Sequence, residues 1–209
     1  MKQWTGNRIL TRMLEVVRAE GYRSLWFKIL GETVYRRVLL VERLLAEPIP
    51  TIEPLAPTTV GLLDAADLDA YLAFRLDTSR DELARRLAAG DVCFVARQAG
   101  RIIAVTWAAT ECGWTRYLGC QIALGPDEVY TYDWLTAPAF RKHHVASQLT
   151  VACLRYFRER GYRRMIYAMA PEKYNQRRGQ TGTGFRAYGM LGYVRIGPYR
   201  WRFTRHLLS

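Results

Sequence analysis

The spacing of apolar positions divides the chain near residue 50. Between residues 8 and 46 apolar side chains recur at helical spacing, with a break at Gly21, and a proline-rich stretch follows. This pattern predicts one short helix, one longer helix and a linker. We therefore assign residues 1–50 to an N-terminal helical extension with its linker, and residues 51–209 to the main domain.

The main domain alternates short apolar runs, typical of strands, with amphipathic helices. The first two helices begin at capping residues, Asp64 in one case and Ser79 or Asp81 in the other. A later helix has one apolar and one basic side and stops at Gly161. The predicted elements are, in order, strand 58–63, helix 64–76, helix 79–90, hairpin 91–110, strand 114–123, strand 128–136, helix 143–160, strand 164–169, helix 183–191 and a closing antiparallel pair over 193–203.

The strand–helix–strand unit over residues 128–169 determines the type of sheet. A crossover of this kind joins parallel strands and is right-handed, whereas the hairpins join antiparallel strands. The predicted fold class is therefore α/β (α+β), with a mixed, mostly antiparallel sheet and flanking helices. A ligand site is expected beyond the carboxyl end of strand 128–136, which feeds the crossover.

Positive charge is concentrated in the last third of the chain. The formal net charge is +12, and residues 140–209 hold 15 Lys and Arg against two acidic residues, whereas residues 1–139 hold 16 against 17. A basic surface of this kind suits a polyanion, such as cofactor phosphates, an anionic substrate, a lipid head group or nucleic acid. A merely solvated arginine face is the simpler alternative.

Several classes of protein are disfavoured by the composition. No segment reaches the ~20 apolar residues that span a bilayer, and the first residues lack the apolar run and cleavage site of a signal peptide. The four cysteines lie far apart without a Cys-x-x-Cys motif, and the three histidines form no metal-ligand pattern with them. We expect reduced thiols, no metal and a cytoplasmic protein.

Residues 137–147, with the sequence APAFRKHHVAS, place basic side chains at the first turn of helix 143–160. The first amides of a helix have no partner within it, and the helix dipole adds about half a positive charge there. A phosphate or pyrophosphate is a natural occupant of such a site. Arg141 and Lys142 would add charge-assisted hydrogen bonds to it.

The same segment resembles the signature of the GNAT superfamily of acyl-CoA-dependent N-acyltransferases. That signature approximates Val-x-Pro-x-Tyr-Arg-Gly-x-Gly-Ile-Gly, and TAPAFRKHHVA aligns with it without a gap. Downstream, AYGMLGY resembles the family's Tyr-x-x-x-Gly-Phe ending, with Tyr188 four residues before Gly192. His144 departs from the pattern, because glycine is usual at its position, where the phosphate approaches the backbone closely. The resemblance covers residues 58–204.

The resemblance implies direct transfer of an acyl group from acetyl-CoA or another acyl-CoA to a primary amine. It implies that the parallel strands 128–136 and 164–169 splay apart to admit the donor. It also places Tyr188 on the last helix, as the acid that protonates the departing thiolate. The residues expected to bind the cosubstrate are Trp134, Leu135, Thr136, Arg141, Lys142, His143, His144, Val145, Ala146, Ser147 and Asn175.

The base that removes the proton of the attacking amine has two candidates on strand 128–136. Glu128 and Asp133 are the carboxylates of this strand and, five residues apart, they are expected to point to opposite faces. Asp133 lies closer to the expected thioester and is favoured as base or substrate anchor. A solvated turn carboxylate is the simpler role for Glu128, water relays could replace either residue, and Tyr188 could be a buried phenol.

Two alternative functions and several partners stay open at this point. The alternatives are a basic nucleic-acid-binding module, indicated by YRWRFTR near the C-terminus, and an inactive scaffold of the same fold held at a membrane. For a transferase, the acceptor is a small-molecule or lipid-linked amine, and nucleic acid is the less favoured partner. Residues 8–46 suit contact with the inner membrane face, a homodimer contact or simple packing onto the domain.

Overall fold

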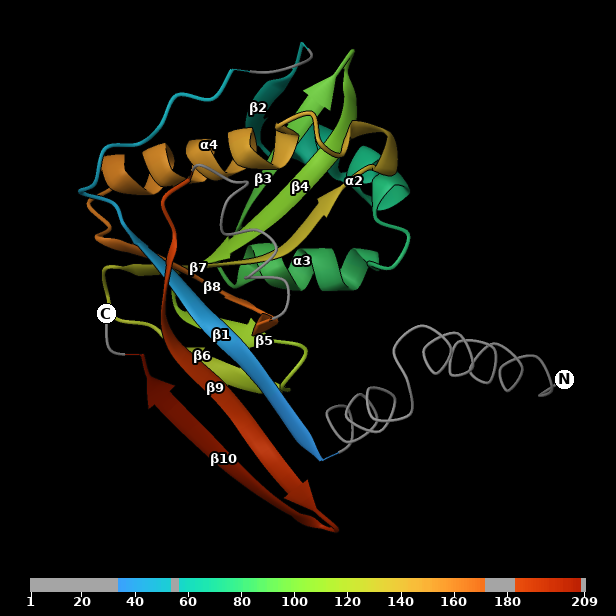
Figure 1. Ribbon diagram of the computed structural model, residues 1–209. Helices are drawn as coiled ribbons and strands as arrows, with labels where there is room; N and C mark the ends of the chain where they lie inside the picture. Colours follow the sequence, from blue (N-terminus) through green and yellow to red (C-terminus); the bar gives the residue numbers. More distant parts are fainter. Residues whose placement is uncertain (1–33, 54–56, 172–182, 208–209) are drawn as a thin grey trace, which may run out of the picture.

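A computed structural model describes residues 34–53, 57–171 and 183–207 and contains a main sheet of eight strands (Figure 1). The strand order across this sheet is β10-β9-β1-β8-β7-β4-β3-β2. A separate hairpin is formed by β5 (Cys112–Thr115) and β6 (Cys120–Ala123). The strands of the main sheet are β1 (Tyr35–Leu44), β2 (Thr59–Leu62), β3 (Val92–Gln98), β4 (Arg101–Ala109), β7 (Glu128–Thr136), β8 (Arg164–Met169), β9 (Arg186–Ile196) and β10 (Tyr199–His206).

The helices cover both faces of the sheet (Figure 1). They are α2 (Leu68–Phe74), α3 (Arg80–Ala88) and α4 (Val145–Glu159). Side chains alternate between the faces along a strand, and β3 shows the division: Val95 packs in one cluster with Tyr71 of α2, whereas Phe94 packs in another with Phe157 of α4. Two apolar cores therefore lie on opposite sides of β3 and β4.

The predicted fold class is confirmed. The strands β7 and β8 pair in parallel through the α4 crossover, and the other strand pairs of the described residues are antiparallel. Both predicted capping residues accept amide hydrogen bonds: Asp64 accepts from the Ala66 and Asp67 amides and caps a 3-10 turn, Ala65–Asp67, and Ser79 accepts from the Glu82 amide at 3.1 Å and caps α3. The helix α2 begins only after that turn, at Leu68, so the capping signals fixed the start of α3 and of the turn that precedes α2.

The prediction of a helix through residues 35–44 was wrong. This segment is β1, which lies inside the sheet between β8 and β9. Its residues from Val38 to Arg43 are buried on both faces, and the apolar run Val38–Val41 lacks the alternation of a half-exposed strand, so it does not distinguish a buried strand from a buried helix. The rest of the predicted extension, residues 1–33, lies outside the described residues.

The predicted short helix over residues 183–191 was also wrong. Residues from Arg186 onward form β9, which pairs with β1 on one side and with β10 on the other. Gly192 permits this close packing, because a Cβ there would lie 2.5 Å from the Arg36 carbonyl oxygen. The predicted antiparallel pair at the C-terminus is confirmed as β9 and β10. Within the described ranges, no helix has the length and apolar character needed to cross a bilayer.

Candidate active site

The parallel pair β7 and β8 opens partway along its length. Pairing runs from Glu128 opposite Arg164 to Tyr130 opposite Ile166, and both strands continue beyond this point without further pairing between them in the described chain. The other edge of β7 stays paired with β4 as far as Thr136. The backbone of residues 134–136 therefore faces the gap on one side, as an extended ligand lying between the strands would require.

The N-terminus of α4 lies directly beyond this gap. A short turn, Pro138–Phe140, ends β7, and α4 begins at Val145, whose side chain is buried and anchors the helix. The first helical hydrogen bond joins the Gln148 amide to the His144 carbonyl at 3.0 Å, so the amides of residues 145–147 precede the helical ladder. The side chains of residues 141–144 are exposed. We call residues 141–147 the cradle.

Two residues of the cradle have left-handed backbone conformations. Lys142 has φ 68° and His144 has φ 61°. Both stand where the family signature has glycine, which populates this region at little steric expense, whereas other residues lose about 1–2 kcal/mol there. The backbone of the cradle therefore follows the path that glycine would favour, although neither residue is glycine. The exposed imidazole of His144 makes no side-chain hydrogen bond at this helix start.

Asp133 occupies an irregular position of β7. The pairing of β7 with β4 shifts register next to it, and Asp133 itself has φ 55°. Its carboxylate accepts hydrogen bonds from Arg75 at 2.9 Å and from Arg86 at 2.7 Å. Both guanidinium groups are nearly buried, and the Asp133 side chain is 17% exposed. The bulge thus turns this carboxylate toward the α2 and α3 side of the sheet.

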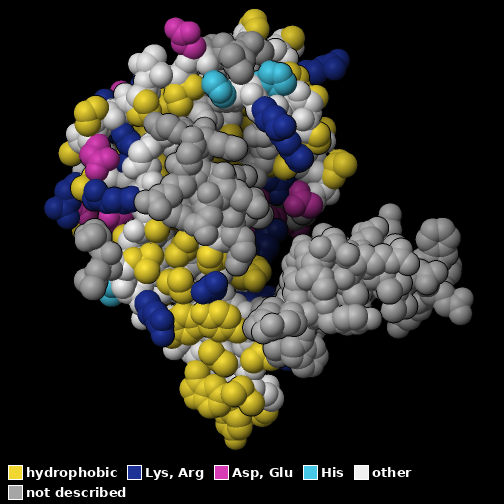
Figure 2. Space-filling view, viewed as in Figure 1, with side chains coloured by type: hydrophobic (Ala, Val, Ile, Leu, Met, Phe, Trp, Pro, Cys, Tyr) yellow, Lys and Arg dark blue, Asp and Glu magenta, His cyan; other side chains and the backbone are white. Residues whose placement is uncertain are grey.

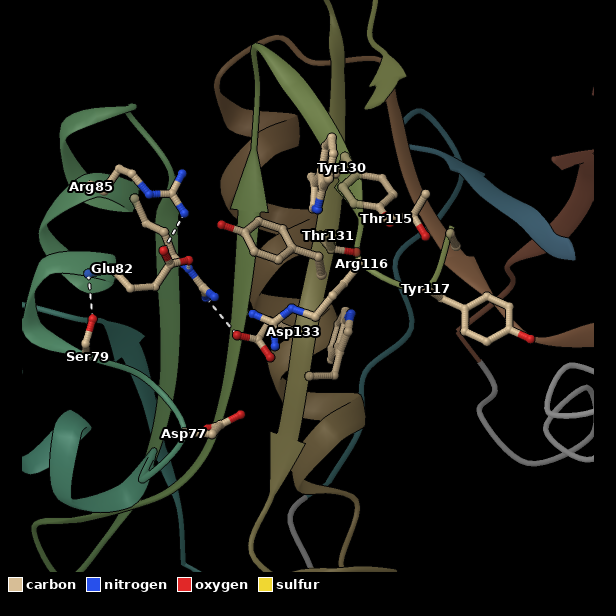
Figure 3. Close-up of a pocket in the computed structure, with 15 residues that line it drawn as sticks. Asp77, Ser79, Glu82, Arg85, Thr115, Arg116, Tyr117, Tyr130, Thr131 and Asp133 are labelled. Atoms are coloured by element: carbon tan, nitrogen blue, oxygen red, sulfur yellow. Dashed lines mark hydrogen bonds and ion pairs between the residues drawn. The ribbon is translucent and has the colours of Figure 1, made fainter. Parts of the chain in front are cut away.

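A pocket of about 950 Å³ opens on that side, between α3, the loop that joins β5 to β6, and residues 130–134 of β7 (Figure 3). Ala168 of β8 also lines it, so the pocket reaches the gap between the parallel strands. Its walls combine the aromatic side chains of Trp114, Tyr117 and Trp134 with charged groups. We call this cavity the α3 pocket.

Tyr132, which lines the α3 pocket, is hydrogen-bonded to Asp91, which is not one of the lining residues. The Tyr132 hydroxyl donates to Asp91 at 2.5 Å, and the Tyr132 ring is stacked between Trp107 and Tyr130 at centroid distances of 6.4 and 6.2 Å. Burial raises the pKa of the Asp91 carboxyl above its usual value of 3.8, although the bond from Tyr132 opposes the shift. Burial raises the pKa of Tyr132 as well. The pair can hold and pass a proton.

Glu128 and Tyr188 lie together, apart from Asp133. Arg164 contacts Glu128 at 2.5 Å, and its guanidinium carbon lies 4.9 Å from the centre of the Tyr188 ring. Tyr188 packs against Tyr130 beside the gap between β7 and β8, and burial raises its pKa to about 12. The placement of Tyr188 on a helix was wrong, because it lies in β9. Glu128 is not among the residues that line the α3 pocket.

The partners of Asp133 and of Tyr132 were not predicted from the sequence. Arg75 and Arg86, which contact Asp133, and Asp91, which contacts Tyr132, are distant from these residues in the sequence, and no local pattern marks them as partners. Asn175, predicted to bind the cosubstrate, lies outside the described residues. Within the described ranges, His, Cys, Asp and Glu side chains form no group of three that could hold a metal ion.

A mixed sheet that splays at a parallel pair, with a helix N-terminus beside the gap, is the architecture of acyl-CoA-dependent transferases. Comparison with family models agrees: the model described as the Acetyltransferase (GNAT) family matches residues 62–178, more than half of the chain. The chain therefore belongs to the GNAT acetyltransferase family. A search of curated protein sequences finds no match to this chain.

Solved structures share the fold at low sequence identity. A protein from Novosphingobium aromaticivorans DSM 12444, assigned to the GNAT family, superposes with a TM-score of 0.52 at 18% identity over 75% of this chain; the match spans 63% of that protein, less than two thirds. The aminoglycoside N-acetyltransferase AAC(6')-Iy, solved with a bisubstrate analogue, gives 0.51 at 20% identity, over 71% of this chain and 100% of that one. A glucosamine N-acetyltransferase region of a fungal multi-domain β-N-acetylglucosaminidase gives 0.55 at 15% identity, over 85% of this chain and 22% of that one.

Proposed function

We propose that the protein transfers an acetyl or other acyl group from acyl-CoA to a primary amine. The amine nitrogen attacks the thioester carbonyl, a C–N bond forms and the C–S bond breaks. The nitrogen then loses one proton and the departing sulfur gains one. Direct attack needs both substrates held in one site with the reacting atoms in contact.

The observation that carries this proposal is the alignment of three features around one gap. The cradle supplies exposed amides and basic side chains for the CoA phosphates. The free edge of β7 at residues 134–136 suits the amide groups of the pantetheine arm. The α3 pocket reaches the same gap at Ala168 and can hold the amine. A donor that passes between β7 and β8 would therefore bring its thioester to the acceptor.

For the acidic and basic steps we propose separate groups. Tyr188 packs beside the gap, and its pKa of about 12 keeps it protonated at neutral pH, as an acid for the thiolate must be. Tyr132 lines the pocket and takes the proton of the amine on its hydroxyl oxygen as it passes its own proton to Asp91. Asp133, whose carboxylate is engaged by two arginines, acts as an anchor of the pocket. Glu128 orients Arg164 under Tyr188.

The test measures thiol release from acetyl-CoA with a panel of primary amines, together with the thermal shift caused by CoA. A double charge reversal in the cradle, R141E with K142E, should weaken CoA binding about tenfold or more, because two favourable charges become repulsive. The control is R205E on β10, an exposed arginine far from the cradle in the sheet order. Absence of both thiol release and CoA binding in the unmodified protein would contradict the proposal and favour an inactive scaffold.

The location and the acceptor also belong to this proposal. We place the enzyme in the cytoplasm, with a small-molecule or lipid-linked amine as acceptor. Contact with the inner membrane face or with a second copy, expected for residues 8–46, is a further part of it for residues 8–33 alone, which lie outside the described residues, because residues 35–44 lie inside the main sheet as β1. Fractionation of the full-length protein between soluble and membrane pools, with and without residues 1–33, tests the membrane contact.

A further inference from the structure

We propose that the acceptor amine carries an anionic group, a carboxylate or a phosphate, which Arg116 binds inside the α3 pocket. This inference rests on the proposed transferase function and names the class of its acceptor. The pairing of the charged side chains in the α3 pocket supports it.

Every carboxylate that lines the α3 pocket is already engaged by arginine. Asp77 accepts from two nitrogens of Arg75, at 2.9 and 3.1 Å. Asp133 accepts from Arg75 and Arg86 on its two oxygens. Glu82 accepts from Arg85 on one oxygen and from Arg86 on the other. These carboxylates are neutralised within the wall, so they offer little attraction to an additional cation.

The pKa values agree with this pairing. The hydrogen bonds from Arg75 hold the pKa of Asp77 below its usual value of 3.8. The hydrogen bond from Arg85 is the main cause that lowers the pKa of Glu82. Both groups are therefore fully ionised and paired at neutral pH. Of the three arginines that line the pocket, Arg85 and Arg86 are paired with its carboxylates, and Arg116 is the third.

Arg116 is the guanidinium group that the wall does not neutralise. It lies on the loop between β5 and β6, and its exposed side chain extends into the α3 pocket (Figure 3). Among the described residues it has no hydrogen bond and no ion pair, although it lies near enough to Asp77 to help lower the pKa of that carboxyl. An arginine fork presents parallel N–H donors that match a carboxylate or a phosphate.

The neighbours of Arg116 indicate what else the acceptor presents. Trp114, near the end of β5, and Tyr117, in the loop next to Arg116, also line the pocket and are 53% and 47% exposed, so their rings are available to a ligand. An acceptor with an anionic end and a ring or sugar to stack on these side chains fits the loop. A polycationic acceptor such as an aminoglycoside would instead find the lining carboxylates Asp77, Glu82 and Asp133 already paired with arginine. The pocket therefore offers little attraction to the acceptors named for the aminoglycoside acetyltransferases that share the fold.

The experiment compares amines in matched pairs that differ by one anionic group. The pairs are 4-(aminomethyl)benzoate with benzylamine, and glucosamine 6-phosphate with glucosamine. For each, thiol release from acetyl-CoA gives kcat/KM, and the thermal shift of the CoA-loaded full-length protein gives binding without turnover. We expect the anionic member of at least one pair to be favoured about tenfold or more in both measurements. Which pair responds distinguishes a carboxylate site from a phosphate site.

Two variants assign the effect to Arg116. R116Q should remove the preference for the anionic member, mainly through KM, and leave the neutral member unchanged. R205Q on β10 removes an exposed arginine elsewhere and should keep the preference. Equal or better binding of the neutral members, or an unchanged preference in R116Q, would overturn the inference about Arg116. Thiol release in the same assays would still support the transferase function. If anion binding depends on Arg116 but no amine causes thiol release, the anion site is supported and the transferase function is refuted.

Discussion

The Asp133 carboxylate lies 2.7 Å from the Arg86 guanidinium, and this ion pair joins the irregular part of β7 to α3. Arg75 contacts the same carboxylate at 2.9 Å. The two arginine side chains are only 5% and 6% exposed, and Asp133 is the counter-charge that they share, beside Asp77 for Arg75 and Glu82 for Arg86. The bulge in β7 therefore places one carboxylate between two buried guanidinium groups.

We predict that D133N destabilises the protein by about 3 kcal/mol, because it leaves two buried guanidinium groups without one of their counter-charges. This corresponds to a fall in Tm of roughly 6–12 °C for a chain of this size. Calorimetry or a thermal melt measures it. If Asp133 anchors the pocket, kcat measured at low temperature, where the variant is folded, falls less than tenfold. If Asp133 is the base, kcat falls by two or more orders of magnitude at the same temperature.

The matched control for D133N is D69N. Asp69 pairs with Arg80 at 2.6 Å, but both side chains are largely exposed, at 85% and 68%. Exposed pairs of this kind contribute about 0–1 kcal/mol. A loss of stability in D69N equal to that in D133N would contradict the role of burial.

The second prediction concerns the left-handed residue at the start of α4. H144G should stabilise the protein by about 0.5–1 kcal/mol, because relief of the strain at φ 61° exceeds the entropy that glycine adds to the unfolded chain. Affinity for CoA, measured by titration calorimetry, should change less than about threefold, since the exposed imidazole makes no side-chain bond at the helix start.

S147G is the control for H144G and should have the opposite sign. Ser147 lies within the first turn of α4, where glycine loses about 0.5 kcal/mol relative to serine. A loss of stability in both variants would show that His144 is not strained. A large loss of CoA affinity in H144G would instead assign the imidazole to the phosphate.

Features of the fold were predicted from the sequence where a few neighbouring residues determine them. The caps at Asp64 and Ser79, and the crossover from β7 to β8, follow from short patterns and were predicted. β1 was taken for a helix because its buried run lacks the alternation of a half-exposed strand. Tyr188 was placed on a helix because a motif match carries no information about backbone conformation.

The chemistry of the α3 pocket could not be predicted from the sequence, for a physical reason. Asp133 faces the arginines through a bulge at φ 55°, and the expected alternation along β7 fails at that residue. Arg86 is 47 positions away in the chain. Only the folded arrangement of α2, α3 and β7 brings these groups together. The cradle, by contrast, is continuous in sequence, and its basic side chains were visible in advance.

The third prediction is a pH profile. If the Tyr132–Asp91 pair takes the proton of the amine, kcat/KM rises with pH as Asp91 ionises, and the raised pKa of Asp91 places this rise above its usual value of 3.8. D91N and Y132F should each lower kcat about a hundredfold and remove that rise. Initial rates between pH 4 and 9 measure it. An unchanged acid limb in D91N would exclude the pair as the proton acceptor.

E111Q tests the same group from outside the site. The negative charge of Glu111 contributes to the raised pKa of Asp91. Its removal favours ionised Asp91, so the acid limb should move to lower pH while the maximal rate stays the same. A shift to higher pH would mean that another group titrates.

The last prediction concerns the contact between Gly113 and Tyr130. An added Cβ at Gly113 would lie 2.7 and 2.9 Å from two carbons of the Tyr130 ring, which lines the α3 pocket beside the gap. G113A should therefore cost about 1–3 kcal/mol through overpacking and raise KM for the amine. G61A, whose Cβ meets only ordinary contact with Arg97 at 3.5 Å, should change stability by less than about 0.5 kcal/mol. Because Y130A removes the clashing ring, G113A should be far less harmful in a Y130A background, and additive effects in this double-mutant cycle would contradict the contact.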